Sequence, residues 1–178
     1  NRYFEPENAR AAARVLRAAG YKVSAIKARA GERPVCCGRT FLSAGLADEA
    51  KSEARRLIDA ARPFVERGVP VVGLEPSCTY ALRDELVGLL PDEARQLAKT
   101  SYLFEEFVAR EHEAGRLSLQ LKPMAREALL HGHCHQKAFD AMRAVERTLA
   151  LVPELKVRAV ESSCCGMAGS FGYAKDNY

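Results

Sequence analysis

Residues 69–78, with the sequence VPVVGLEPSC, give the clearest indication of the fold. The apolar run 69–74 is short, rich in valine and bounded by glycine and proline, which is typical of a buried strand in a parallel sheet. Cys78 lies just beyond the end of this run. Ligands of open α/β sheets bind beyond the carboxyl ends of the strands, so the segment predicts an α/β fold with a thiol at its functional edge.

The rest of the chain alternates between the two kinds of periodicity. The pattern predicts helices at residues 6–19, 48–67, 80–90, 92–113 and 136–151, and strands at residues 21–26, 128–130 and 156–160. We therefore expect an α/β fold of two pseudo-repeated lobes, with mainly parallel strands flanked by helices and cysteines at the C-terminal ends of strands. The first lobe, with a helical connector, spans residues 1–115. The second spans residues 116–178, and we expect it to be truncated at its C-terminus, because the chain stops straight after a glycine-rich segment.

The six cysteines form a repeated pattern of two vicinal pairs and two single residues. The pairs are Cys36-Cys37-Gly38 and Cys164-Cys165-Gly166, while Cys78 follows the first pair and Cys134 precedes the second. Neighbouring residues of an extended segment point to opposite sides, so a vicinal pair can reach two atoms of a polynuclear centre. Every cysteine falls shortly after a predicted strand, so we expect all six thiols along one rim, where helix N-termini favour the thiolate.

Two simpler explanations compete with metal binding. Buried cysteines can pack as small apolar side chains, and an even number of cysteines can form disulfides. A disulfide framework belongs mainly to small secreted domains, whereas a chain of 178 residues can bury a core without one. Because the sequence shows no secretory signal and no transmembrane run, we favour a cytoplasmic setting with metal-binding or redox thiols.

Composition argues against nucleic acid as a partner. The net charge is only +4, with 27 basic and 23 acidic residues spread along the expected helices, as on a solvated surface. Aromatic residues make up 7% of the chain and tryptophan is absent, which leaves little for base stacking.

Four motifs carry a resemblance to a known family: CCGRTFLSAGL, VVGLEPSC, HGHCHQKA and SCCGMAGSFGY. Together they resemble the cysteine-rich CCG domain found in the B-type component of heterodisulfide reductase and in the iron–sulfur parts of glycolate, glycerol-3-phosphate and D-lactate dehydrogenases. They are most similar to the version at the C-terminus of FAD-linked 2-hydroxy-acid dehydrogenases. The resemblance implies a [4Fe-4S] cluster, including the non-cubane type, as the cofactor. It also implies electron transfer from FAD on a partner domain or subunit to a downstream acceptor, which could hold the protein at the membrane periphery.

The resemblance also implies which residues bind the cofactor. Cys134, Cys164 and Cys165 match the ligands of the second lobe, whose further downstream cysteine lies beyond this sequence. Cys36, Cys37 and Cys78 match the first lobe, although Tyr80 and Ala81 stand where heterodisulfide reductases have another cysteine. Zinc in a structural or interaction module, and thiol–disulfide exchange at bare cysteines, remain alternatives.

Several neighbours of the cysteines are further candidates. His133 and His135 could bind metal beside Cys134 and would share a face with His131 in an extended segment, or all three could cap a helix. Gly166, Gly169 and Gly172 lack the lysine and hydroxyl of a phosphate loop, so we expect them to let backbone N–H groups approach the cofactor.

Two charged residues stand close to the single cysteines in the sequence. We expect a structural role for Glu75, next to Cys78. Lys137 could balance an anionic thiolate centre or be an ordinary exposed lysine.

Overall fold

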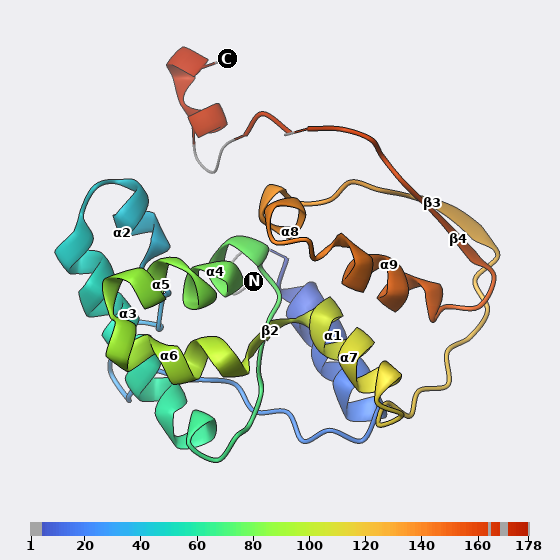
Figure 1. The fold of residues 1–178 in the computed structure, drawn as a ribbon, viewed down its shortest axis with the longest axis horizontal. Helices are drawn as coiled ribbons and strands as arrows, with labels where there is room; N and C mark the ends of the chain where they lie inside the picture. Colours follow the sequence, from blue (N-terminus) through green and yellow to red (C-terminus); the bar gives the residue numbers. More distant parts are fainter. Residues whose placement is uncertain (1–4, 164, 168–170, 178) are drawn as a thin grey trace. The chain divides into compact units, whose positions relative to one another are not determined.

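The chain folds into two compact units, residues 1–119 and residues 120–178. The computed structural model describes residues 5–163, 165–167 and 171–177 (Figure 1). Each unit contains its own two-stranded parallel sheet, so the described residues form two separate small sheets. The architecture is mixed α/β, which confirms the predicted fold class.

The first unit is mainly helical. Its helices are α1 (Pro6–Ala18), α2 (Arg39–Ser43), α3 (Ala47–Val65), α4 (Pro76–Arg83), α5 (Glu85–Leu89), α6 (Pro91–Thr100) and α7 (Phe104–Glu113). Its strands are β1 (Val71–Gly73) and β2 (Ser101–Leu103), which pair in parallel with Val72 opposite Tyr102. The pairing places α4, which follows β1 directly, at the carboxyl end of this sheet.

Helix α3 organises the core of the first unit. Its buried residues Ala54, Ile58, Ala61 and Val65 recur every three or four positions and so form one apolar stripe. Ala54 and Ala61 have no exposed surface, and their small side chains allow other helices, α6 above all, to pack closely. Cys37 is part of the same core cluster as this stripe.

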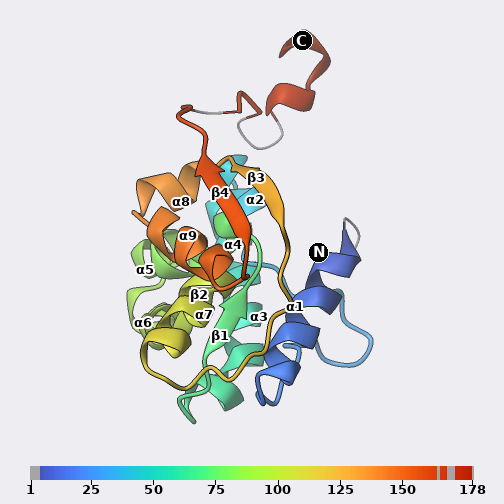
Figure 2. The same cartoon turned by 90° about the vertical axis from the view of Figure 1, so that its right-hand side faces the viewer.

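The second unit is built on strands β3 (Arg126–Leu130) and β4 (Leu155–Ala159), which run side by side in parallel (Figure 2). Between them come α8 (Cys134–Ala138) and α9 (Met142–Ala150), and two short 3₁₀ turns follow, η1 (Phe171–Tyr173) and η2 (Lys175–Asn177). Helix α9 packs on β4. The loop after β3 therefore leads to Cys134, and the loop after β4 leads towards the second cysteine pair.

Three details of the predicted topology are wrong. Residues 21–26 form no strand, so Cys36 and Cys37 do not follow one, and the first repeat lacks the strand that β4 supplies in the second. The helix predicted at residues 92–113 is interrupted by β2. The two sheets of the described residues are separate, so the single rim expected for all six cysteines is not formed by one sheet. In contrast, the strands predicted at 69–74, 128–130 and 156–160 are confirmed as β1, β3 and β4, and the helix at 48–67 as α3.

Candidate metal centre

The first unit brings together three thiols from two distant segments. Cys36 and Cys37 lie just before α2, and Cys78 lies in the first turn of α4. The side chain of Cys37 hydrogen bonds with the side chains of both Cys36 and Cys78. Cys37 is buried, Cys36 is half-buried and Cys78 is exposed, so the group runs from the core to the surface.

Gly38 shapes the backbone around the first pair. Its φ angle of 82° lies in the left-handed region, and a Cβ atom at this position would stand 2.5 Å from the carbonyl oxygen of Ala50 in α3. The backbone N–H of Gly38 donates to the Cys36 Sγ at 3.5 Å. The glycine of this tripeptide therefore serves both close packing and the approach of an N–H group to sulfur, which is the role the sequence predicted for glycines of the second pair.

Hydrogen bonds from Cys78 and from the backbone N–H of Arg39 favour the thiolate of Cys37 and lower its pKa to about 6. Burial raises the pKa of Cys36, and the hydrogen bond to Cys37 raises the pKa of Cys78. The group therefore holds one thiolate and two thiols near neutral pH, and a bound cation would draw the other protons off.

Glu75 has the structural role expected of it. Its side chain accepts a hydrogen bond from the backbone N–H of Ser77 at 3.1 Å and so caps α4. Pro76 follows at the first helical position, where its missing N–H costs nothing. This start positions Cys78 in the first turn of the helix, with its side chain directed to Cys37.

The donor set of the first unit fits a thiophilic metal or an iron–sulfur cluster. It offers three sulfur ligands and a backbone N–H donor to sulfur, and Cys37 belongs to the apolar core cluster that also contains Ala81 and Leu82. In the part of the chain that the structure describes, no three His, Cys, Asp or Glu side chains stand at metal-binding spacing. Cys37 instead hydrogen bonds with Cys36 and with Cys78.

In the second unit, one of the histidines around Cys134 caps a helix. His133 caps α8, since its Nδ1 accepts from the backbone N–H of His135 at 3.1 Å, while the Gln136 side chain accepts from the His133 N–H. The rings of His133 and His135 stack with centroids 5.2 Å apart. The segment is not extended as far as His135, because the helix begins at Cys134, and capping, the alternative considered for these histidines, is confirmed for His133.

Lys137 is not an ordinary exposed lysine. Its Nζ donates to the carbonyl oxygens of Ser162 and Ser163 at 2.6 and 2.8 Å and lies 3.4 Å from the Ser162 hydroxyl. That hydroxyl also lies 2.9 Å from His131 Nδ1. Sequence reasoning missed Ser162 and Ser163, because two serines next to a cysteine pair carry no periodic or motif signal of their own.

The second pair itself is only partly described. Cys165 is exposed, and Gly166 has a φ angle of 83°, almost the value of Gly38. A Cβ at Gly166 would meet nothing within 4 Å, so no close approach among the described residues requires this glycine. Predicted ligand Cys164 and predicted cofactor contact Gly169 lie outside the described residues.

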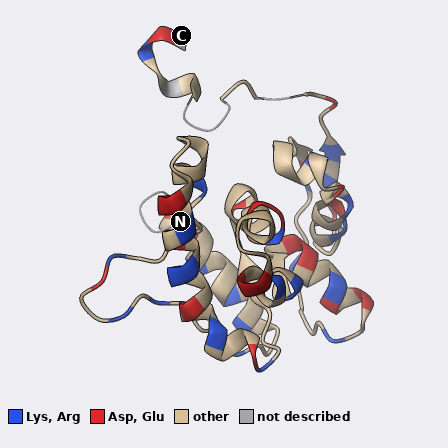
Figure 3. Ribbon diagram, turned by 60° about the vertical axis from the view of Figure 1, so that its left-hand side comes forward, with Lys and Arg blue, Asp and Glu red and all other residues tan. Residues whose placement is uncertain are grey.

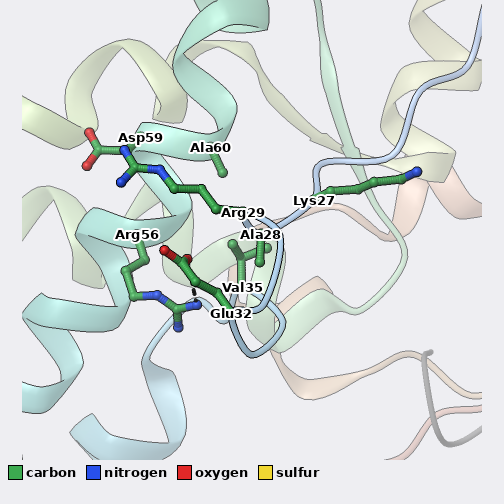
Figure 4. Close-up of a pocket in the computed structure, with 8 residues that line it drawn as sticks. All are labelled: Lys27, Ala28, Arg29, Glu32, Val35, Arg56, Asp59 and Ala60. Atoms are coloured by element: carbon green, nitrogen blue, oxygen red, sulfur yellow. Dashed lines mark hydrogen bonds and ion pairs between the residues drawn. The ribbon is translucent and has the colours of Figure 1, made fainter.

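A separate pocket of about 150 Å³ lies in the first unit and contains no thiol (Figure 4). Arg56 reaches across it to Glu32 at 3.5 Å and also pairs with Glu53, so its charge is already neutralised. The volume is below the roughly 300 Å³ of a small-ligand site. Basic and acidic residues are both scattered over the helices and loops of the described chain (Figure 3). None of the described helices has both the length and the apolar character needed to cross a bilayer.

Comparison with known proteins gives a family match for the first half of the chain. Residues 1–83 match the family model described as "CCG: Cysteine-rich domain". The chain is 29% identical over 177 residues to the C component of the anaerobic glycerol-3-phosphate dehydrogenase of Escherichia coli K12, and equally to its counterpart in Escherichia coli O157:H7. The alignments cover 99% of this chain but 43% of each relative, so the chain spans less than half of their length. No solved structure matches.

The match to the CCG model includes all three thiols of the first unit, Cys36, Cys37 and Cys78. Both relatives are subunits of a dehydrogenase, which is an oxidoreductase. The resemblance indicated by the four sequence motifs, to the cysteine-rich CCG domain, is therefore confirmed, with the family model covering residues 1–83.

Proposed function

We propose that this chain is an iron–sulfur electron-transfer domain of a flavin-linked oxidoreductase. The observation that carries the proposal is the convergence of Cys36, Cys37 and Cys78, from two segments about forty residues apart in the sequence, within the region that matches the CCG domain. Thiolates that converge in a reducing compartment are ligands for iron or zinc. The similarity to a dehydrogenase subunit favours iron and a redox role.

A [4Fe-4S] cluster would supply one-electron transfer, and the chain would supply the conditions for it. Cys36, Cys37 and Cys78 would hold the cofactor in the first unit, and Cys134, Cys164 and Cys165 in the second. The Gly38 N–H, which already donates to a cysteine sulfur, would stabilise added negative charge there and so raise the reduction potential. Cys37, anchored in the core, would hold the cofactor against the unit.

The remaining parts of the proposal concern partners. We propose that electrons come from FAD on a partner domain or subunit that oxidises a 2-hydroxy acid, and pass to a downstream acceptor from a cytoplasmic position. The relatives named for glycerol-3-phosphate support a small secondary alcohol as the class of substrate.

Metal and sulfide analysis of protein prepared without oxygen tests the proposal. We expect a brown protein containing iron and acid-labile sulfide, and we expect Cys37→Ser to remove the iron of the first unit, because Cys37 contacts both other thiols. Cys134→Ser should remove only the iron of the second unit, so the two variants serve as controls for each other.

Zinc binding gives a distinct result in the same experiment. A colourless protein with stoichiometric zinc would replace the proposal with a structural or interaction module. A metal-free protein that forms reversible mixed disulfides would indicate thiol–disulfide exchange.

A further inference from the structure

We propose that Lys137 is a positioning residue that joins the two cysteine-bearing segments of the second unit. It lies one turn into α8, which begins at Cys134, and binds the backbone of Ser162 and Ser163, which directly precede Cys164 and Cys165. The purpose of this link, to hold both segments at the spacing of one cofactor, rests on the proposed function. The link itself stands on the contacts alone.

The contacts account for the whole hydrogen-bonding capacity of the ammonium group. An ammonium has three N–H donors, and the three oxygens near Lys137 Nζ all belong to residues 162 and 163. The two carbonyl contacts, at 2.6 and 2.8 Å, have the short lengths of charge-assisted hydrogen bonds. Such bonds are stronger than those between neutral groups, so one side chain can hold this backbone.

The contacts of Lys137 begin just beyond the end of the sheet. The last backbone hydrogen bond between the two strand segments runs from the Val160 N–H to the Leu130 carbonyl at 2.8 Å. Beyond it, the hydrogen bonds described for residues 161–163 are those with Lys137 and His131. These contacts therefore tie the segment after Val160 to the strand and helix that flank Cys134.

The HGHCHQK motif builds this link residue by residue. A Cβ at Gly132 would lie 2.3 Å from Met142 Sδ and 3.2 Å from Lys137 Cε, so a larger residue here would displace Met142 and crowd the lysine stem. His133 and Gln136 cap each other's backbone and fix the start of α8. His131 Nδ1 lies 2.9 Å from the Ser162 hydroxyl. The motif is therefore explained by attachment of the 161–163 segment as well as by the cysteine at its centre.

Backbone ¹⁵N relaxation of the metal-free chain tests the link directly. In the wild type, residues 161–163 should have order parameters near 0.85, and in Lys137→Met they should fall below about 0.6, the value of a flexible backbone. Lys156→Met is the matched control, because Lys156 is an exposed lysine on β4 of the same unit, and its order parameters at 161–163 should equal those of the wild type. Unchanged order parameters in Lys137→Met would overturn the proposal.

Lys137→Arg tests geometry separately from charge. Its planar fork keeps the charge but cannot place one nitrogen between both carbonyls, so intermediate order parameters are expected. This variant carries the test if Lys137→Met does not fold, and values equal to those of the wild type would then count against the link.

The purpose of the link is tested in anaerobically reconstituted protein. Lys137→Met, but not Lys156→Met, should lose iron from the second unit or change its electron paramagnetic resonance spectrum. A mobile segment with unaltered iron content and spectrum would refute positioning of the cofactor. A wild type that binds no iron would refute the proposed function, while the relaxation result would still decide whether the link exists.

Discussion

The two CCG tripeptides show how one residue pattern can serve different purposes. Gly38 and Gly166 share the same left-handed backbone conformation, with φ angles of 82° and 83°. Of the two, Gly38 is also packed against another described element, because the Ala50 carbonyl of α3 occupies the place of its missing Cβ. The conformation belongs to the tripeptide, whereas the close packing belongs to the first unit.

We predict that Gly38→Ala destabilises the protein by more than about 2 kcal/mol, because the left-handed conformation costs an alanine roughly 1 kcal/mol and the contact with Ala50 adds to it. Gly45→Ala is the control, since Gly45 has a φ angle of 77° but nothing within 4 Å of its Cβ position. It should cost only about 1 kcal/mol. Urea unfolding measures both values, and equal losses would show that the Ala50 contact has no energetic weight.

The sequence predicted the convergence of the cysteines better than the roles of the residues beside them. Convergence of Cys36, Cys37 and Cys78 could be predicted because a vicinal cysteine pair followed by a single cysteine is typical of one shared binding site. Capping by His133 could be offered only as one alternative, and the contacts of Lys137 could not be predicted, since both roles depend on where the α8 backbone starts and, for Lys137, on a loop about 25 residues away. A polar side chain near a cysteine looks the same in sequence whether it serves sulfur or backbone.

Among the elements, α7 and the segment after α1 are joined through one buried carboxylate. Glu111 of α7 is 4% exposed and accepts hydrogen bonds from Tyr21 at 2.8 Å and from Arg116 at 2.7 and 2.9 Å, with Arg110 as a third partner. These partners, led by Arg116, lower the pKa of Glu111 to about 2. The network ties together two segments about ninety residues apart in the chain.

We therefore predict that acid weakens the first unit through Glu111. A carboxylate with a lowered pKa contributes stability that is present above its ordinary pKa of about 4.5 and is lost as the pH falls from about 5 to 2. Glu111→Gln should cost about 1–3 kcal/mol at pH 7 and flatten the pH dependence of thermal unfolding over that range. The exposed residue Glu66 provides the control, Glu66→Gln, and an equally steep curve in Glu111→Gln would contradict the assignment.

The same network explains one error in the predicted elements. Residues 21–26 alternate as a strand would, but none of the described strands pairs with them, and Tyr21 is held by a side chain instead. Strand β2 was not predicted for the opposite reason, because here pairing creates a strand that the local pattern does not indicate. It is three residues long, and parallel pairing with β1 overrides the helical pattern that continues through it. Local periodicity records which face is apolar, while pairing depends on a partner elsewhere in the chain.

For the whole molecule, each of the two units carries its own cysteines. The boundary near residue 119 lies close to the one predicted at 115, and residues 114–125, all of them described, form no helix or strand between α7 and β3. The chain aligns with less than half of its dehydrogenase relatives. The proposed function gives this chain the electron-transfer step and gives substrate oxidation to a partner.

This division of labour predicts a kinetic separation. In the complete enzyme, replacing Cys164 and Cys165 with serine should leave flavin reduction by substrate largely intact but slow electron delivery to an external acceptor. Stopped-flow absorbance resolves the two steps, and Ser163→Ala, at the residue just before the pair, serves as a control for a local change that removes no thiol. An unaltered acceptor rate would place the second unit off the electron path.

Cys37 couples the oxidation of a thiol to the stability of the first unit. Its sulfur belongs to the hydrophobic core, at 7% exposure, as well as to the thiol group. Over-oxidation to a sulfinic acid is irreversible for most proteins and would place a charged group in the core cluster that contains Ala54, Ile58 and Leu82. Oxidation of Cys37 would therefore remove a thiol from the group and at the same time destabilise the first unit.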